Sequence, residues 1–318
     1  MNARGHLFFA AGLTFLVFCT PTGAVPVLGP DRWTEPVAVT EVNTDSAEEW
    51  SPFLSYDGLT LYFARVRSDT FYYGRIFEAT RQQPVGPFTS VKEISGPLNS
   101  SAGHNLLPWV SPDNLRMYYH NESGGRFSLQ ISERSTVDDP WPQGTSILEL
   151  NALGDQIQAP KLTPDERTIF FNAYDIPGGK GAYDLWMASR PDRDSLFGQV
   201  TNLAELNTTT SEWAPCVTPD GLTLYFASNR NGSSQLFRAT RASLDSTFGP
   251  AEHLAFLETP PWQNNHPYLG GDGTAFYFVR QLGDDRSTQD IYVSYIPEPA
   301  TLLLLGLGAM LLRKKRPS

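Results

Sequence analysis

Two short segments of the chain place a tryptophan directly after acidic residues. They read Glu48-Glu49-Trp50 and Glu212-Trp213. An indole ring can stack on the C–H face of a sugar while neighbouring polar groups bind its hydroxyls, so both segments are candidates for carbohydrate binding. The carboxyl groups could instead form a glycosidase pair, which requires a separation of about 5–5.5 Å or about 6.5–9.5 Å. Alternatively, both indole rings could simply pack inside the protein.

Two histidines complete the candidate set. His104 and His266 could ligate a metal ion together with Glu212, but the chain lacks a short ligand spacing such as His-Glu-x-x-His. It also lacks a Gly-x-Ser-x-Gly elbow, a Walker loop and a Cys-x-x-Cys motif. We therefore assign no metal, no cofactor and no catalytic residue. The candidate ligand-binding residues are Glu48, Glu49, Trp50, His104, Glu212, Trp213 and His266.

These candidates lie just before the prolines of a sequence unit that occurs five times. Each copy has Pro five residues before an Asp, and an apolar-aromatic-aromatic triplet that begins four residues after it. The aspartates are Asp57, Asp113, Asp165, Asp220 and Asp272. The pattern predicts a strand, a two-residue Asp-Gly hairpin turn and a second strand. Glu166 replaces the glycine in the third copy, so we expect that turn to differ in type.

Two further strands follow each hairpin. Arg75–Arg81 is the third strand of the first copy, and an aromatic residue opens a fourth strand in four copies. Four strands per period of about 50 residues are typical of a propeller blade. The fifth copy lacks a fourth strand, and Trp33–Val39 matches the missing pattern. The sequence therefore predicts an all-β, five-bladed β-propeller of four-stranded blades over residues 25–296, with the last blade closed by the N-terminal strand.

The repeat resembles the WD40-like, TolB-type (PD40) propeller repeat. That pattern runs Pro, Ser-Pro-Asp-Gly, an aromatic strand and an Asp-Ile-Tyr strand, and Asp290-Ile291-Tyr292 reproduces its end. The resemblance implies a propeller fold. It indicates function only loosely, because members of this class often bind proteins in the periplasm or at the cell surface, and some related domains occur in carbohydrate-active proteins.

The N-terminal residues have the pattern of a secretory signal peptide. Arg4 is followed by an apolar run and then by Thr22-Gly23-Ala24, so we predict a signal peptide over residues 1–24. A membrane anchor is the alternative, although the apolar run is shorter than the ~20 residues that a spanning helix needs.

The C-terminal residues combine Pro297-Glu298-Pro299, a short apolar stretch and a basic end. This tail, residues 297–318, resembles the PEP-CTERM sorting signal of exported bacterial proteins. The resemblance implies a short transmembrane helix and cleavage at the Pro-Glu-Pro motif by an exosortase, a membrane protease. The protein would cross the inner membrane, remain anchored until tail processing, and then reside in the cell envelope or outside the cell.

Composition narrows the class of partner. The chain has 318 residues, with 24 basic and 34 acidic side chains and a formal net charge of −10, which argues against nucleic-acid binding. We predict a non-catalytic module that binds a protein or a polysaccharide at the cell envelope. The alternatives are a glycoside hydrolase or lyase that uses the carboxylates at the channel mouth, and a structural component of the extracellular matrix.

Overall fold

The computed structural model describes residues 33–67, 73–100, 103–257 and 261–296. The predicted signal peptide and the predicted transmembrane segment of the tail lie outside these residues. None of the helices in the described part of the chain is long and apolar enough to cross a membrane.

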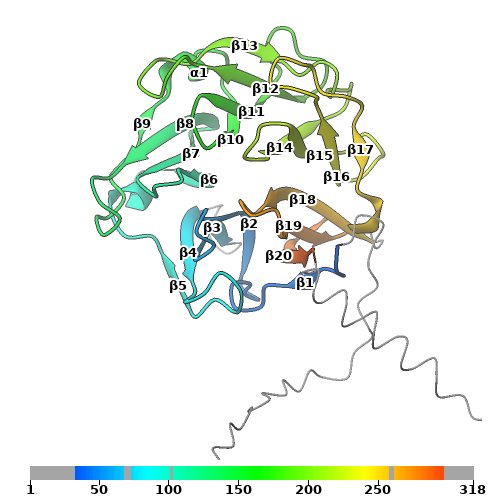
Figure 1. Cartoon of the computed structure of the whole chain (residues 1–318). Coiled ribbons are helices and arrows are strands. Elements are labelled where there is room, and N and C mark those ends of the chain that lie inside the picture. Colours follow the sequence, from blue (N-terminus) through cyan, green and yellow to red (C-terminus); the bar gives the residue numbers. More distant parts are fainter. Residues whose placement is uncertain (1–32, 68–72, 101–102, 258–260, 297–318) are drawn as a thin grey trace, which may run out of the picture.

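Five four-stranded antiparallel sheets form a ring (Figure 1), which confirms the predicted five-bladed propeller. Each of the innermost strands contacts its two neighbours around the ring, and β18 contacts β2. From inside outwards, blade 1 contains β2 (Ala47–Leu54), β3 (Thr60–Arg67), β4 (Tyr73–Thr80) and β5 (Ser90–Glu93). Blade 2 contains β6 (His104–Val110), β7 (Arg116–Ser123), β8 (Arg126–Glu133) and β9 (Thr145–Ser146).

The other three blades follow the same order. Blade 3 contains β10 (Ile157–Leu162), β11 (Thr168–Tyr174), β12 (Tyr183–Ser189) and β13 (Gly198–Asn202). Blade 4 contains β14 (Glu212–Val217), β15 (Thr223–Ser228), β16 (Gln235–Thr240) and β17 (Glu252–His253). Blade 5 contains β18 (Trp262–Leu269), β19 (Ala275–Leu282), β20 (Asp285–Tyr295) and, outermost, β1 (Val37–Ala38). The short helices are η1 (Pro97–Ser100), α1 (Leu148–Asn151) and η2 (Ala255–Leu257).

The N-terminal strand closes the ring as predicted. Val37 pairs with Val293 in antiparallel register. Asn43 then bonds both backbone groups of Ile291, its Nδ2 donating to the carbonyl oxygen at 2.9 Å and its Oδ1 accepting from the amide at 2.9 Å. Residues from both ends of the described chain therefore build one sheet, and β1 supplies the fourth strand of that blade.

The Asp turns are not the two-residue hairpins that the sequence predicted. Four residues lie between Ser55 and Thr60, and Gly58 N donates to Ser55 O at 2.8 Å. Gly58 has a positive φ of 72°, and Asp57 Oδ1 accepts from Leu59 N at 3.0 Å. This geometry is a type I turn followed by a left-handed residue, so the Asp acts as a turn former.

The expected difference in the third turn is wrong as well. Glu166 adopts the same left-handed conformation, with a φ of 58°. Its carboxylate accepts hydrogen bonds from Arg116 at 2.5–2.9 Å and from the Tyr118 hydroxyl at 2.9 Å. Because these bonds tie the turn of blade 3 to blade 2, they offset the cost of a positive φ at a residue with a Cβ atom.

An arginine fastens each turn in the first four blades. In blade 2, Arg134 donates from Nε to Asn114 O at 2.9 Å and from Nη1 to Asp139 O at 3.2 Å. Its guanidinium lies 4.1 Å from the ring centroid of Trp141, which precedes the outer strand. The same arrangement joins Arg81, Arg190 and Arg241 to Phe88, Phe197 and Phe248.

Replacing this arginine should destabilise the propeller. Arg134→Ala removes two hydrogen bonds and a cation–π contact, and we expect it to lower the free energy of unfolding by about 2–4 kcal/mol. Arg126→Ala in the same blade is the matched control. Its ion pair with Asp155 is exposed at both ends, so its loss should cost less than about 1 kcal/mol. Urea denaturation followed by tryptophan fluorescence measures both, and equal effects would contradict this role for Arg134.

Candidate functional site

Each inner strand has a β-bulge immediately before the proline of the repeat. The residue that precedes the proline has a positive φ in all five blades, between 48° and 60°. These residues are Ser51, Leu107, Ala159, Ala214 and His266. The pairing register with the second strand shifts at the same points. Because a bulge bends the strand, it re-aims the side chains on either side of it.

A cavity of about 620 Å³ opens at the mouth of the ring. The residue two before each repeat proline lines this cavity in four blades: Trp50, Gln158, Trp213 and Asn265. Blades 1, 3, 4 and 5 thus contribute to its wall. The other groups are mostly amides and hydroxyls, namely Asn172, Tyr183, Ser211, Asn229, Ser233, Ser234, Gln263, Gln281 and Gln289, together with His266 and Asp284.

The cavity contains an aromatic pair from two different blades. The rings of Trp50 and His266 stack with their centroids 5.9 Å apart and their planes at 22°. Nδ1 of His266 donates to Oδ1 of Asn265. Burial and, to a smaller extent, the charge on Lys161 together lower the pKa of His266 to about 3. The imidazole is therefore neutral near pH 7, and the pair presents an uncharged aromatic surface.

Two of the candidate carboxylates do not reach the cavity. Glu49 is fully buried within blade 1, where it accepts hydrogen bonds from Arg65 Nε at 2.8 Å and from Thr44. Burial raises the pKa of Glu49 to about 7, against the opposing effect of Arg65. Glu212 occupies the same position in blade 4 and accepts hydrogen bonds from Thr208, Ser228 and Arg230.

These two glutamates form the same structural unit. Arg65 Nη2 donates to Val42 O and Arg230 Nη2 donates to Leu206 O, each at 2.7 Å. Blade 5 builds the unit with Asn264 in place of the glutamate, bonded to Arg280 Nε at 3.1 Å. In all three blades this residue, Glu or Asn, accepts a hydrogen bond from an arginine of the same blade. The two carboxylates therefore have a structural role inside their blades.

The remaining candidates also lie outside the cavity wall. Glu48 is buried in β2. His104 Nε2 lies 3.0 Å from Glu122 Oε2, and its Nδ1 accepts from Gly74 N at 2.9 Å. Burial lowers the pKa of His104. Within the described residues, no three His, Cys, Asp or Glu side chains are placed to hold a metal ion, so His104, His266 and Glu212 do not form such a group. Of the seven candidates, the structure brings Trp50, Trp213 and His266 together.

The cavity wall includes two buried amides with fixed orientation. Asn172 Oδ1 accepts from the backbone N of Ala214 at 3.1 Å, which leaves its Nδ2 without a protein partner. Gln281 Nε2 donates to Gly283 O at 2.8 Å, so its Oε1 accepts from Gln289. Oε1 of Gln289 then has no protein partner. Asn172 Nδ2 and Gln289 Oε1 are therefore a donor and an acceptor without a protein partner, both buried behind the surface of the wall.

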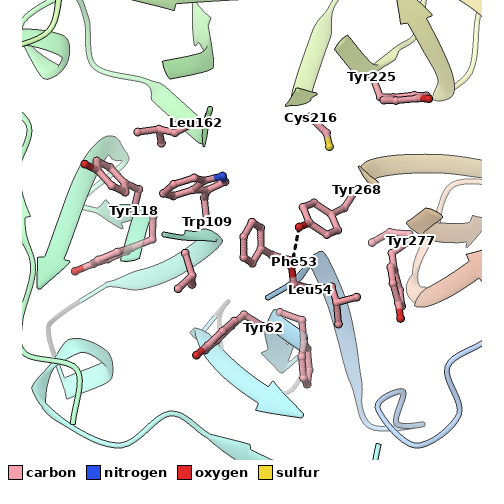
Figure 2. Close-up of a cluster of buried hydrophobic side chains, with 14 of the residues drawn as sticks. Phe53, Leu54, Tyr62, Trp109, Tyr118, Leu162, Cys216, Tyr225, Tyr268 and Tyr277 are labelled. Atoms are coloured by element: carbon pink, nitrogen blue, oxygen red, sulfur yellow. Dashed lines mark hydrogen bonds between the residues drawn. The ribbon is translucent and has the colours of Figure 1, made fainter. Parts of the chain in front are cut away.

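Below the bulges, large side chains close the channel. Phe53, Trp109, Cys216 and Tyr268 point toward one another in Figure 2, and the Tyr268 hydroxyl donates to Leu54 O at 2.7 Å. The spaces left in this region are about 10 Å³ each. The cavity is therefore a blind depression, which a ligand enters and leaves from one face.

Sequence reasoning missed the amides Asn172, Gln281 and Gln289 and the hydroxyl of Tyr183. They belong to second and third strands, which the repeat pattern identifies as structural. One signal was available for Asn172. It stands where the first and fourth blades have Ala64 and Ala227, and an amide at a small apolar core position suggests a special role.

Comparisons with known proteins agree with this architecture. Residues 296–316 match the family model described as the PEP-CTERM protein-sorting motif. No curated protein matches the chain. The catalytic domain of a GH62 α-L-arabinofuranosidase from Coprinopsis cinerea has a TM-score of 0.55 at 14% identity, over 83% of this chain and 96% of that one.

Two other solved structures are similar. The α-L-arabinofuranosidase PaAbf62A from Podospora anserina has a TM-score of 0.53 at 14% identity, over 81% of this chain and 93% of that one. A putative TolB from Agrobacterium tumefaciens has a TM-score of 0.47 at 15% identity, over 84% and 99%. The likeness to the arabinofuranosidases shows a shared fold. The chain is an exported β-propeller that carries a PEP-CTERM sorting signal at its C-terminus.

Two histidines, the buried His120 and the partly buried His266, should make stability depend on pH. Burial lowers the pKa of both His120 and His266 to about 3, from 6.5. Below pH 6.5 the unfolded chain takes up protons that the folded chain excludes, so stability falls as the pH drops from 6.5 toward 3. Each histidine contributes about 1.4 kcal/mol per pH unit to this slope.

Replacing one of them tests the effect. Between pH 6 and pH 4, the loss of stability of His120→Leu should be smaller than that of the parent by about 1.4 kcal/mol per pH unit, measured by urea denaturation. Asn231→Gln, at an exposed loop residue without a titratable group, is the control and should retain the parental slope. An unchanged slope in His120→Leu would contradict the assignment.

Proposed function

We propose that this protein is a non-catalytic binding module for an uncharged polysaccharide, which it holds in the cavity at the channel mouth. One observation carries the proposal. Trp50 and Trp213 lie in a depression whose other described lining groups are almost entirely amides and hydroxyls. Aromatic faces suit the C–H surfaces of pyranose rings, and amides suit their hydroxyls.

The charge of the cavity wall supports a neutral ligand. Among its described lining residues there is no lysine or arginine, and Asp284 is the single carboxylate. Gln263 Nε2 donates to Asp284 Oδ1 at 2.9 Å. A uronate or phosphate polymer would find no cation to pair with in this cavity, so we expect neutral chains to be preferred.

Binding is favoured over hydrolysis by the placement of the acids. A glycosidase needs two carboxyl groups on either side of the scissile bond. Glu49 and Glu212 are instead committed to Arg65 and Arg230 inside their blades. Because the fold is shared with arabinofuranosidases, hydrolysis is the alternative function, and the experiment must measure it directly.

Export and sorting complete the proposal. The tail would be cut at Pro297–Pro299 by an exosortase-type protease, which would release the propeller from the inner membrane to the cell envelope or the medium. A polysaccharide-binding module released there could attach to the cell's own matrix polymers.

Trp213→Ala should abolish retention on the polysaccharide. We expect at least a tenfold loss of affinity, because a stacking surface of the cavity disappears while the fold is retained. The measurement is retention of the purified protein on an array of neutral and acidic polysaccharides, with released reducing ends assayed in the same samples. Trp262→Ala, an indole outside the cavity wall, is the matched control and should bind normally.

The other outcomes are equally informative. Release of reducing ends by the parent protein, lost in Glu212→Gln, would replace the binding module with an enzyme. Retention on acidic chains alone would contradict the neutral ligand. If no polymer retains the protein or releases reducing ends, polysaccharide binding is contradicted, and a protein ligand or a structural matrix role is left.

A further inference from the structure

The described chain ends on the face of the ring that carries the Asp turns. Ile296 N donates to Thr274 O at 2.8 Å, and Thr274 belongs to the turn formed by Asp272 and Gly273. Arg134 makes the equivalent backbone bond in blade 2, to Leu115 O. Ile296 therefore stands where the other blades have the arginine that fastens the turn. We call this side the turn face.

The cavity lies at the opposite end of the same blade. β19 begins at Ala275, which pairs with Tyr295 beside the turn face. It ends next to Gln281, and Gln281 and Asp284 line the cavity. Eight residues of antiparallel strand span roughly 23 Å. The point where the tail begins and the mouth of the cavity are thus separated by the full height of the propeller.

No linker separates the propeller from the sorting signal. Pro297 opens the Pro-Glu-Pro motif directly after Ile296, whose amide is bonded within the last blade. A chain segment of several free residues would let the propeller tumble above a membrane. Here the attachment point is fixed in the sheet, so the face that carries it is held near whatever holds the tail.

The turn face has an uneven surface chemistry. Its loops expose four apolar side chains, Val85, Val137, Leu196 and Leu244, which can contact lipid headgroups and upper acyl chains. The five exposed turn aspartates, by contrast, are repelled by anionic lipid. Adsorption through this face alone would therefore be weak, which makes the short attachment the dominant orienting influence.

We propose that the anchored propeller sits with its turn face against the lipid surface and its cavity directed away from the membrane. The inference rests on the prediction that residues 297–318 hold the chain in the membrane. Its consequence is that the candidate site is open to polysaccharide before the tail is processed.

Fluorescence quenching by lipid-borne quenchers tests this orientation. The chain without its predicted signal peptide, residues 25–318 with Cys216→Ala, is reconstituted into phosphatidylethanolamine and phosphatidylglycerol vesicles that contain brominated lipid. A fluorophore is attached through Val137→Cys on the turn face or through Asn231→Cys on the cavity side. Both parent side chains are exposed. We expect the Val137→Cys probe to lose at least half of its emission and the Asn231→Cys probe to lose little.

The competing outcomes are separable. Equal quenching of the two probes, or stronger quenching of the Asn231→Cys probe, would overturn the orientation. A chain that fails to float with the vesicles would overturn the anchor and the orientation with it, while leaving polysaccharide binding untouched.

A linker insertion tests the cause. With 20 Gly and Ser residues inserted between Ile296 and Pro297, the chain should still float with the vesicles but lose the difference between the two probes. A difference that persists would overturn the short attachment as the orienting cause.

Discussion

The left-handed residue before each repeat proline is the constraint on which the rest of the molecule depends. A residue that precedes proline is normally extended, and a positive φ is uncommon for any residue with a Cβ atom. Such a conformation costs of order 1–3 kcal/mol. The propeller accepts it five times, once in every inner strand. The bulge separates two sets of inner-strand side chains along the propeller axis. Side chains before it, such as Trp50 and Trp213, line the cavity, and those after it, such as Phe53 and Cys216, close the channel.

The architecture was predictable because it is repeated. Five copies of one pattern supply the blade count, the strand order and the closure by the N-terminal strand without any knowledge of contacts. The detailed turn geometry was not predictable. Asp-Gly is compatible with several turn types, and Glu166 in the glycine position is explained only by Arg116 and Tyr118 from the neighbouring blade. Interactions between blades are invisible in a pattern that is read one blade at a time.

The candidate site divides in the same way. Trp50, Trp213 and His266 could be placed at the mouth from their position before the proline. Glu49 and Glu212 directly precede these two tryptophans. They face the interior of the blade, because successive residues of a strand point to opposite sides. The proline marks where the bulge lies, but the repeat pattern does not tell which of the two preceding residues, Glu or Trp, faces the cavity. The amides of Asn172 and Gln289 depend on neighbours from other blades or strands, Ala214 and Gln281.

The closure of the last blade has a consequence for how the protein reaches its folded state. Val37 must find Val293, so the ring joins residues from the two extremes of the folded region, and the loop that closes is nearly the whole chain. β1 precedes β20 in the chain, so during export it is present before the strand edge with which it pairs has formed. β20, which supplies that edge, ends one residue before Ile296. The residues that complete the ring are therefore among the last of the folded region. The ring, and with it the candidate site, can be completed only after β20 has formed the edge that β1 pairs with.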